Sequence, residues 1–234
     1  MLARPSTLSA LRPAVLVPAY RCAESVRQVV EGARRYVPDV LVVDDGSGDA
    51  TAEEARRGGA RVVVREANGG KGCAVRDGLA VLLREPFSHV AFVDADGQHD
   101  PEELPKLLAA AAAGADFVVG SRLANPEGMP AKSYWANTIG DKVLQRMTGL
   151  PIQDGQSGYR LIAAELLRPL RLVARRYAIE NEILVKACRR VRRFATVPVR
   201  SIYPPGPKHY RPFHDTWVTS WLTVHYKTTG SHDS

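Results

Sequence analysis

The chain has 234 residues, of which 45% are hydrophobic and 24% are charged, and it carries a formal net charge of +7. This length and apolar content suit one α/β domain with a proper core, or two small ones, and they exclude a disordered chain. The basic surplus favours anionic partners such as nucleotides, phosphates, nucleic acid or an anionic membrane face, although a soluble protein with many surface arginines has the same balance.

The three cysteines, Cys22, Cys73 and Cys188, are far apart and odd in number. Their spacing argues against a zinc site or a disulfide framework and agrees with a reducing cytoplasm. Residues 1–12 contain no apolar run that suits a secretory signal. No stretch reaches the ~18 consecutive apolar residues of a membrane span. We therefore expect a cytoplasmic protein in which residues 1–12 form an N-terminal extension.

Short apolar runs alternate with helical patterns over the first half of the chain. Pro18 is expected to end the first of these runs. The runs predict strands at 14–17, 40–43, 61–64, 90–93 and 116–119. The helical patterns predict helices at 25–36, 51–57, 71–84 and 101–113.

The pattern loosens after residue 123, where a loop containing proline and glycine spans 125–130. The rest of the chain predicts helices at 133–147, 180–191 and 215–226 and a last strand at 195–202. Nearly continuous apolar strands separated by helices predict an α/β fold whose sheet is mostly parallel and covered on both faces.

Polar residues follow four of the predicted strands at their carboxyl ends. They are Asp44-Asp45, Asn68, Asp94-Ala95-Asp96 and Ser121-Arg122. Ligands of open parallel sheets bind at this edge. We therefore expect the four clusters to meet in one active site.

Asp94 and Asp96 are one residue apart at the end of a strand, so their side chains are expected to point to the same side. Two such carboxylates suit Mg²⁺ together with substrate phosphates, and the amide of Gln98 is a candidate third ligand, directly or through a water. The competing interpretation is that the aspartates only cap the helix at Pro101. Asp100 directly precedes that proline and is the better capping residue, which leaves the other two for a metal.

Asp44 and Asp45 are candidates to accept hydrogen bonds from a ribose or a base. The alternative is an acidic turn in which Ser47 or Asp49 caps the next helix. Lys71 follows two glycines at the start of a predicted helix, where open N–H groups attract an anion. The segment lacks the P-loop spacing, so Lys71 is either near a phosphate or a plain surface lysine.

Further charged residues are candidates for the acceptor side of the site. Arg122 follows the fifth predicted strand and suits a bidentate contact with phosphate. Arg160 and Lys208 are additional cations in the second half of the chain. Glu180 and Glu182 form a close acidic pair that either orients an acceptor or makes salt bridges on a solvated helix.

Six segments occur in the order VLVPAY, VVDDGSGDAT, NGGKGCAVRDGL, FVDADGQHDPEELP, DFVVGSR and QSGYRL. Together they resemble family 2 glycosyltransferases of the GT-A fold, in the branch of dolichol-phosphate mannose synthase and bacterial polyprenyl-phosphate sugar transferases. The resemblance implies a Rossmann-like, mostly parallel sheet flanked by helices in a single domain. It implies a nucleotide-sugar-binding half at 13–122, an acceptor half at 123–215, and an amphipathic helix and tail at 216–234.

The resemblance also implies an inverting transfer of a sugar from a UDP- or GDP-linked donor to a polyprenyl or dolichyl phosphate, with Mg²⁺ or Mn²⁺ as cofactor. Carried over by position, the residues that hold the nucleoside are Pro18, Tyr20, Asp44 and Asp45. Those that hold the metal and the donor diphosphate are Asp94, Asp96 and Gln98. Those that act on the reacting groups are Asp96, Arg122 and Arg160, with Lys208 helping to close the site.

The chemistry of this transfer fits the residues. A phosphate acceptor is already anionic and needs no strong base, so the problem is to bring two anions together and to stabilise a departing diphosphate. A divalent ion does this as a Lewis acid, and preorganised arginines do it electrostatically.

Two departures from the family pattern affect the substrates. Many members read Tyr-Asn-Glu after the first strand, whereas this chain reads Tyr20-Arg21-Cys22-Ala23, so the acidic contact to the nucleoside is absent or moved to Glu24. Many relatives also carry C-terminal transmembrane helices, and this sequence has none. The donor base therefore stays open between uracil and guanine, and a lipid acceptor requires a peripheral membrane surface.

The predicted C-terminal helix carries Trp217 and Trp221 near basic residues, which suits the inner face of a membrane. The alternative is a helix that packs on the core or on a partner subunit. Candidate partners are therefore a lipid phosphate at a membrane surface, a second copy of the chain, or a membrane protein.

Other functions remain as alternatives. A sugar nucleotidyltransferase would need a glycine-rich basic signature, which residues 14–21 lack. A nucleic-acid binder has acidic clusters in the wrong place and no recognisable motif. A nucleotide-sugar-binding module without catalysis is disfavoured by the intact aspartate pair. A glycosyltransferase that acts on the hydroxyl of a soluble acceptor would need a base, for which the candidates are Asp154, Glu180 and Glu182.

Overall fold

The computed structural model describes residues 11–123, 131–200 and 202. Several features of the sequence lie outside the described residues. They are Lys208, the predicted helix at 215–226 with Trp217 and Trp221, the loop at 125–130, and most of the predicted extension at 1–12.

Within the described residues the strands form one seven-stranded sheet in the order β3-β2-β1-β4-β6-β5-β7. β6 runs antiparallel to both of its neighbours, and the other pairs are parallel. The strands are β1 (Pro13–Ala19), β2 (Val40–Asp44), β3 (Arg61–Val64), β4 (His89–Phe92), β5 (Phe117–Ser121), β6 (Arg160–Ala163) and β7 (Phe194–Pro198). The mostly parallel sheet that the sequence predicts is confirmed.

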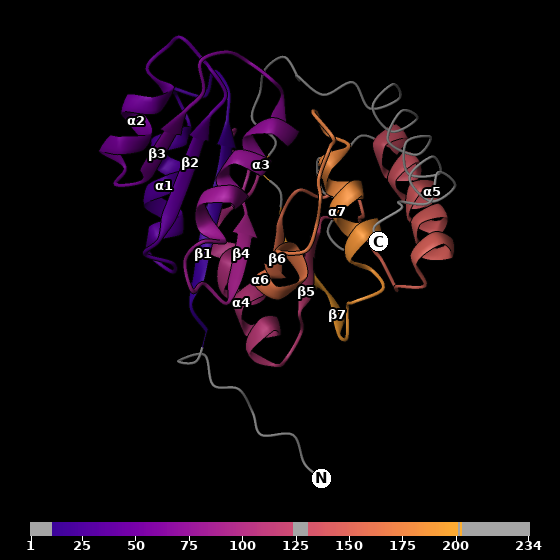
Figure 1. The fold of residues 1–234 in the computed structure, drawn as a ribbon. Coiled ribbons are helices and arrows are strands. Elements are labelled where there is room, and N and C mark those ends of the chain that lie inside the picture. Colours follow the sequence, from indigo (N-terminus) through magenta and orange to yellow (C-terminus); the bar gives the residue numbers. More distant parts are fainter. Residues whose placement is uncertain (1–10, 124–130, 201, 203–234) are drawn as a thin grey trace.

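Helices cover both faces of this sheet (Figure 1). They are α1 (Val26–Arg34), α2 (Thr51–Arg57), α3 (Lys71–Leu82), α4 (Leu104–Ala112), α5 (Ala131–Thr148), α6 (Ala164–Leu167) and α7 (Ile179–Ala187). A single 3-10 turn, Pro101–Glu103, precedes α4, and the side chain of Asp100 caps it by accepting the N–H of Glu102 at 3.0 Å. The predicted capping role of Asp100 is thus confirmed.

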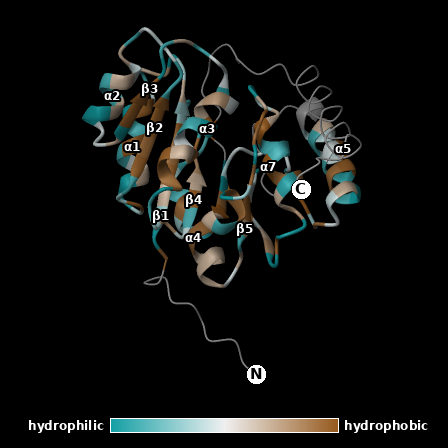
Figure 2. Ribbon diagram, in the orientation of Figure 1, coloured by the Kyte–Doolittle hydropathy of each residue, from teal (hydrophilic) through white to brown (hydrophobic). Residues whose placement is uncertain are grey.

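Successive strand residues point to opposite faces, so the strands supply two cores. Leu16 packs in the core beneath α3, α6 and α7, whereas Val15 packs in the core beneath α1 and α4. Strands such as β2 are coloured as hydrophobic along their length in Figure 2. Burial on both faces explains why the strands read as continuous apolar runs instead of alternating ones.

The prediction that Pro18 ends the first strand is wrong, because β1 continues to Ala19. Val15 donates its N–H towards β2, and the carbonyl of Leu16 accepts the N–H of Val93 on the β4 side. By alternation, the nitrogen of Pro18 faces the β4 side. The pairing with β4 ends at Leu16, so the N–H that proline lacks has no partner strand there.

The sequence prediction also missed β6, which is short and begins at Arg160, at the end of a polar segment that contains glycine. Its four residues are buried on both sides, so they show no alternation. No described helix combines the length and the apolar content that crossing a bilayer demands.

Candidate active site

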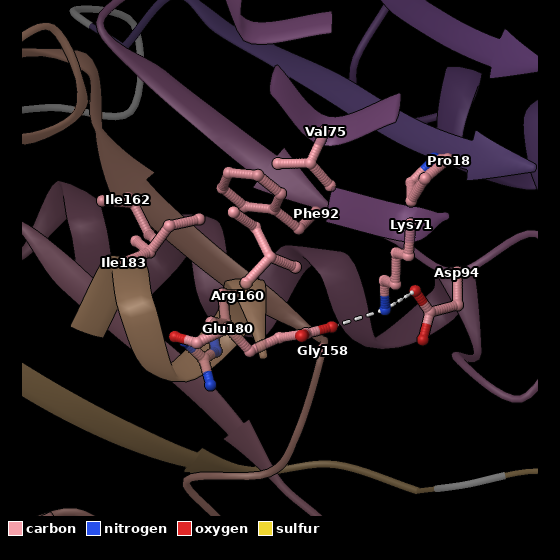
Figure 3. A pocket seen from close by; sticks show the side chains of 11 residues that line it. Pro18, Lys71, Val75, Phe92, Asp94, Gly158, Arg160, Ile162, Glu180 and Ile183 are labelled. Carbon is pink, nitrogen blue, oxygen red and sulfur yellow. Dashed lines mark hydrogen bonds and ion pairs between the residues drawn. The ribbon is translucent and has the colours of Figure 1, made fainter. Parts of the chain in front are cut away.

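The candidate active site lies where β1 and β4 end and β6 begins. Because β6 is antiparallel, Arg160 at its start pairs with the last residue of β4. Gly158 and Arg160 therefore reach the sheet edge that also carries Asp94. Figure 3 shows these residues around a small cavity, in which ion pairs join Lys71 to Asp94 and to Glu180.

Two glycines set the position of Lys71 at the start of α3. Gly70 has a φ of +92°, and a Cβ there would lie 2.4 Å from the carbonyl oxygen of Arg175. A Cβ on Gly72 would lie 2.2 Å from the carbonyl oxygen of Ala174. The N–H of Gly72 instead donates to Arg175 at 2.9 Å. Only glycine permits this close approach, which fixes the start of α3 against the segment before α7.

Lys71 bridges two carboxylates from different parts of the chain. Its Nζ lies 2.6 Å from Asp94 Oδ1 and 2.6 Å from Glu180 Oε1. Burial alone would lower the pKa of Lys71, but the two carboxylates outweigh it and raise that pKa above its ordinary value. With 17% of its side chain exposed, Lys71 belongs to the interior of the site and is not the plain surface lysine of the alternative interpretation.

Asp94 is held as a carboxylate by its neighbours. Burial would raise the pKa of Asp94, but Lys71, and more weakly His99 and Arg122, bring it to about 2. Nδ1 of His99 accepts the N–H of Asp94 at 3.0 Å, and Nε2 lies 3.7 Å from Asp94 Oδ2. The ring stacks on Tyr159, and burial lowers the pKa of His99 to about 4. His99 is therefore neutral near pH 7, and because Nδ1 accepts a hydrogen bond, its proton lies on Nε2, the nitrogen 3.7 Å from Asp94 Oδ2.

Asp96 differs from Asp94 because it is exposed and, within the described residues, forms no ion pair, so that Lys71 acts on it only weakly. Its Oδ1 accepts the N–H of Gln98 at 2.9 Å. Crowding by neighbouring atoms, and then the negative charge of Asp94, raise the pKa of Asp96. Burial and, more weakly, Asp96 also raise the pKa of the Cys22 thiol, so the loop after β1 lies close to this carboxylate.

The donor set fits a hard divalent cation bound partly by its substrate. Asp94 and Asp96 supply carboxylate oxygens, and the repulsion between them is relieved by positive charge. Among the residues that the structure describes, no group of three or more His, Cys, Asp or Glu side chains gathers into a complete metal cage. Mg²⁺ and similar ions are commonly held by one or two carboxylates with substrate phosphates, which is what this edge of the sheet supplies.

Arg122 is oriented by a relay of two buried aspartates. Its Nε and Nη2 donate to the two carboxylate oxygens of Asp154, each at 2.7 Å. Asp154 has a φ of +58°, and the N–H groups of Asp154 and Gly155 donate to the carboxylate of Asp141, each at 2.7 Å. Burial raises the pKa of Asp141 to about 6, although these two donors oppose it. The relay fixes the guanidinium on the side of the site that faces α5.

Arg160 is buried, and its guanidinium binds backbone carbonyl groups. It is 2% exposed, and it donates to the carbonyl oxygens of Ser157, Gly155 and Glu180 at 2.8, 2.7 and 2.6 Å. Burial lowers the pKa of Arg160 to about 10, which still leaves it charged. Its geometry supports the backbone around the site, and the predicted contact with a phosphate stays a prediction.

Asp44 and Asp45 are both buried, and both already bind protein groups. Asp44 Oδ1 accepts the N–H of Ser47 at 3.0 Å and also its hydroxyl. Asp45 accepts the N–H groups of residues 69–70 at 3.0 and 2.7 Å and a guanidinium hydrogen of Arg65. A nucleoside that contacts these carboxylates has to share or replace these bonds.

Pro18 and Tyr20 lie on the same side of the site as these aspartates. Pro18 lines the small cavity, and Tyr20 is 41% exposed beside the guanidinium of Arg21. The alternative capping role is partly confirmed, because Asp49 accepts the N–H of Thr51 at 2.9 Å at the start of α2.

The structure thus joins Lys71, Asp94 and Glu180 directly, with Asp96 and Arg122 nearby. Glu182 points elsewhere: its carboxylate accepts the N–H groups of residues 173–174 and pairs with Lys186 at 2.9 Å.

Three residues of the site were not singled out from the sequence. They are His99, Asp141 and Gly158. His99 lies inside the quoted DADGQH motif. A Cβ on Gly158 would meet Asp94 Oδ2 at 3.0 Å and Lys71 Nζ at 3.1 Å, so this glycine keeps room for the ion pair.

Comparison with known proteins identifies the family and the fold. The family model described as "Glycosyl transferase family 2" matches residues 14–171. The glycosyltransferase AglJ of Haloferax volcanii is 32% identical over 198 residues, which cover 82% of this chain and 63% of that protein. The polyprenol monophosphomannose synthase of Mycolicibacterium smegmatis is 35% identical over 175 residues, 70% of this chain and 66% of that protein. The match therefore spans just under two thirds of the length of these two relatives.

A third relative is matched over more of its length. The undecaprenyl-phosphate mannosyltransferase of Micrococcus luteus is 32% identical over 205 residues, which cover 81% of this chain and 83% of that protein. Among solved structures, glucosyl-3-phosphoglycerate synthase of Mycobacterium tuberculosis with Mn²⁺, UDP-glucose and phosphoglyceric acid superposes with a TM-score of 0.71 at 22% identity. The superposition covers 97% of this chain and 82% of that one and confirms the GT-A fold. The chain belongs to glycosyl transferase family 2 and has the GT-A fold.

Proposed function

We propose that this glycosyltransferase moves a sugar, with inversion, from a UDP- or GDP-linked donor to a polyprenyl or dolichyl phosphate, using Mg²⁺ or Mn²⁺. Two of the relatives above are named for polyprenol or undecaprenyl-phosphate acceptors. In the proposed step an acceptor phosphate oxygen forms a bond to the anomeric carbon, and the bond from that carbon to the donor diphosphate breaks.

One observation carries the choice of a phosphate acceptor over a hydroxyl acceptor. A hydroxyl needs a base, and the three candidate bases are all engaged by cations or N–H groups. Glu180 is ion-paired with Lys71 through Oε1, although its buried Oε2 accepts no hydrogen bond within the described part of the chain. Glu182 is ion-paired with Lys186, and Asp154 accepts three hydrogen bonds from Arg122. A hydroxyl acceptor would therefore have to compete with these cations for the carboxylate that is to take its proton. A phosphate acceptor, in contrast, attacks without giving up a proton.

Other residues of the site suggest how the negative charges of the diphosphate and the acceptor phosphate are stabilised. Asp94 and Asp96, with Gln98, would hold the divalent ion, which when bound supplies Lewis acidity to the leaving diphosphate. Lys71 keeps Asp94 ionised and in place. Arg122, preorganised by Asp154, presents fixed positive charge to the acceptor phosphate or to the diphosphate.

The proposed roles of the other residues depend on where they lie along the sheet. In the proposal, Pro18, Tyr20, Asp44 and Asp45 form the nucleoside side within a donor half at 13–122, and the acceptor half is 123–215. Arg160 supports the loop before β6 from inside. Lys208 stays a proposed contact outside the described residues.

A lipid acceptor places the enzyme at a membrane surface. We propose peripheral association with the inner face of the membrane from the cytoplasm, and a second copy or a membrane protein as a further partner. Nucleic acid is not a proposed partner, because the site edge carries the carboxylates of Asp94 and Asp96.

The test incubates the purified chain with Mn²⁺ or Mg²⁺, a panel of UDP- and GDP-sugars, and a short polyprenyl phosphate. Release of nucleoside diphosphate and the mass of a lipid-linked sugar are both followed. The matched controls are the same polyprenol without phosphate, 3-phosphoglycerate as a soluble acceptor, and the Asp96→Ala variant.

The expected result is a metal-dependent product with the polyprenyl phosphate, little with the polyprenol, and none with the variant. Equal turnover of the polyprenol would refute the argument from the engaged carboxylates. If product forms only with a soluble acceptor, the proposed lipid acceptor is wrong and the soluble compound is the acceptor. Metal-dependent nucleotide binding without any turnover would favour a binding module.

A further inference from the structure

Helix α5 has the polarity of its two faces reversed relative to an ordinary surface helix. Its buried face carries the polar Asn137 and Asp141, which are 8% and 5% exposed, together with Leu144 in the core. Its outer face carries Trp135, Ile139 and Val143, which are 63%, 62% and 38% exposed. A surface helix normally buries its apolar residues and exposes its polar ones. The pattern indicates that the outer face of α5 has an apolar partner.

The apolar residues form one continuous stripe. Trp135, Ile139 and Val143 are spaced by four residues, which places them one above the other along the helix. Nothing within the described part of the chain covers them. α5 lies beside α7 at one end of the molecule (Figure 1), and the exposed fractions of the three side chains show that the stripe reaches solvent.

Positively charged side chains beside the same stripe indicate an anionic partner. Lys142 and Arg146 are both exposed, and helical spacing places them beside Trp135 on the outer face. An exposed tryptophan, aliphatic residues and two cations on one face are typical of a helix that lies in the interface of an anionic bilayer. A second protein subunit would more often cover the apolar stripe with charge-depleted contacts. We propose that the outer face of α5 docks on an anionic membrane surface.

The inner face of the same helix connects this surface to the site. Asp141 accepts the N–H groups of Asp154 and Gly155, and Asp154 in turn orients Arg122. A membrane on the outer face of α5 therefore lies on the Arg122 side of the active site, where a lipid-borne phosphate would arrive. This last step rests on the proposed function, whereas the docking surface itself does not.

The test measures binding of the full chain to vesicles, without donor or acceptor. Vesicles of phosphatidylcholine with and without phosphatidylglycerol are sedimented with wild type and with the double variant Trp135→Ser/Ile139→Ser. The control is Val64→Ser, which removes an equally exposed apolar side chain from β3 at the far edge of the sheet. A further variant, Lys142→Gln/Arg146→Gln, tests the charge.

The expected result is that wild type and Val64→Ser bind the anionic vesicles, and that the Trp135→Ser/Ile139→Ser variant partitions at least about tenfold less. The Lys142→Gln/Arg146→Gln variant should bind more weakly, with less dependence on salt. Thermal unfolding should be nearly unchanged in each variant, because the replaced side chains are exposed.

Two results would overturn the inference. One is wild-type protein that ignores anionic vesicles, or that binds them as well after the α5 substitutions. The other is a wild-type dimer in light scattering that becomes a monomer in the Trp135→Ser/Ile139→Ser variant without change in vesicle binding, which would make α5 a contact between two copies. Turnover of a short, water-soluble polyprenyl phosphate without vesicles tests the proposed function separately and should not change in these variants.

Discussion

Two pairs of aspartates at the same edge of the sheet differ in the groups that bind their carboxylates. Asp44 and Asp45, after β2, are buried and receive hydrogen bonds from backbone N–H groups, a hydroxyl and a guanidinium. Asp94 and Asp96, after β4, receive few backbone donors. Asp94 is ion-paired with the ammonium of Lys71, and the pKa of Asp96 is raised by desolvation from neighbouring atoms and then by the negative charge of Asp94.

The difference separates carboxylates that build the site from carboxylates that remain able to bind a ligand. A carboxylate satisfied by buried N–H groups stabilises a fold, because its removal leaves those donors without a partner. A pair with unrelieved repulsion gains most from an added cation. The motifs look alike in the sequence, and only their contacts distinguish them. The following predictions test this division.

The largest expected effect is on activity, from Asp96→Asn. Loss of this carboxylate should lower turnover by about a hundredfold to a thousandfold, since it removes charge that would hold the divalent ion at the leaving group. Stability should change by less than about 0.5 kcal/mol, because Asp96 is exposed. Nucleoside diphosphate release and urea unfolding measure the two quantities. Normal turnover in this variant would show that Asp96 is not needed to bind the metal ion.

Asp45→Ala should mainly affect stability, with a decrease of about 3 kcal/mol in the free energy of unfolding. The substitution removes a buried carboxylate that accepts two N–H groups and pairs with Arg65, so several buried donors lose their partner. Urea unfolding measures the change in the free energy of unfolding. The exposed Asp77 also pairs with Arg65, at 2.7 Å, and Asp77→Ala is the control that should cost less than about 1 kcal/mol. Equal losses would show that Asp45 has no special structural role.

Gly158→Ala should lower activity by about tenfold or more with a smaller effect on folding. The new Cβ would lie 3.0 Å from Asp94 Oδ2 and 3.1 Å from Lys71 Nζ, so the ion pair has to move, and small displacements in a site are costly. Gly140→Ala in α5 is the matched control, because its Cβ would meet only Gln156, at 3.8 Å, and alanine favours a helix. Steady-state kinetics compare the two variants. If both behave alike, the space beside Asp94 is not limiting.

The smallest effect is expected for Asp141, which accepts two N–H groups as Asp45 does, whereas the guanidinium of Arg122 pairs with Asp154 and only weakly opposes the rise in its pKa. Its pKa is raised to about 6, so the folded protein binds a proton between about pH 4 and pH 6 that the unfolded chain does not. Wild-type stability should therefore rise, relative to Asp141→Asn, as the pH falls through this window, by about 1 kcal/mol or more. Urea unfolding at several pH values measures it. A difference that stays flat would mean that Asp141 titrates normally.

The sequence was sufficient for most of the fold, because strands buried on both faces and helices with clear periodicity produce strong local patterns. α2 and β3 match their predicted ranges, and the pairing of Asp94 with Asp96 at a strand end was visible directly. The antiparallel β6 was not predicted, since its position between β4 and β5 depends on long-range pairing.

The contacts that were missed within the site share this cause. Lys71 meets Glu180 across more than a hundred positions of the sequence, and no local pattern reports such a contact. Asp141 carried a signal that was available: it occupies the face of α5 opposite Trp135 and Ile139, where a core residue would be apolar. The inverted pattern of that helix predicts a buried polar relay inside and an apolar partner outside.

The insertion of β6 also has a consequence for the order in which the protein assembles during synthesis. β4 and β5 follow one another in the chain, yet the strand between them is made only when residues 160–163 leave the ribosome. Until then one edge of β4 has no partner, and an open edge is a template for pairing with other chains. Pairing over such separations is slow to form. We expect nascent chains that end before residue 160 to need protection by a chaperone, and those that extend beyond β7 to need less.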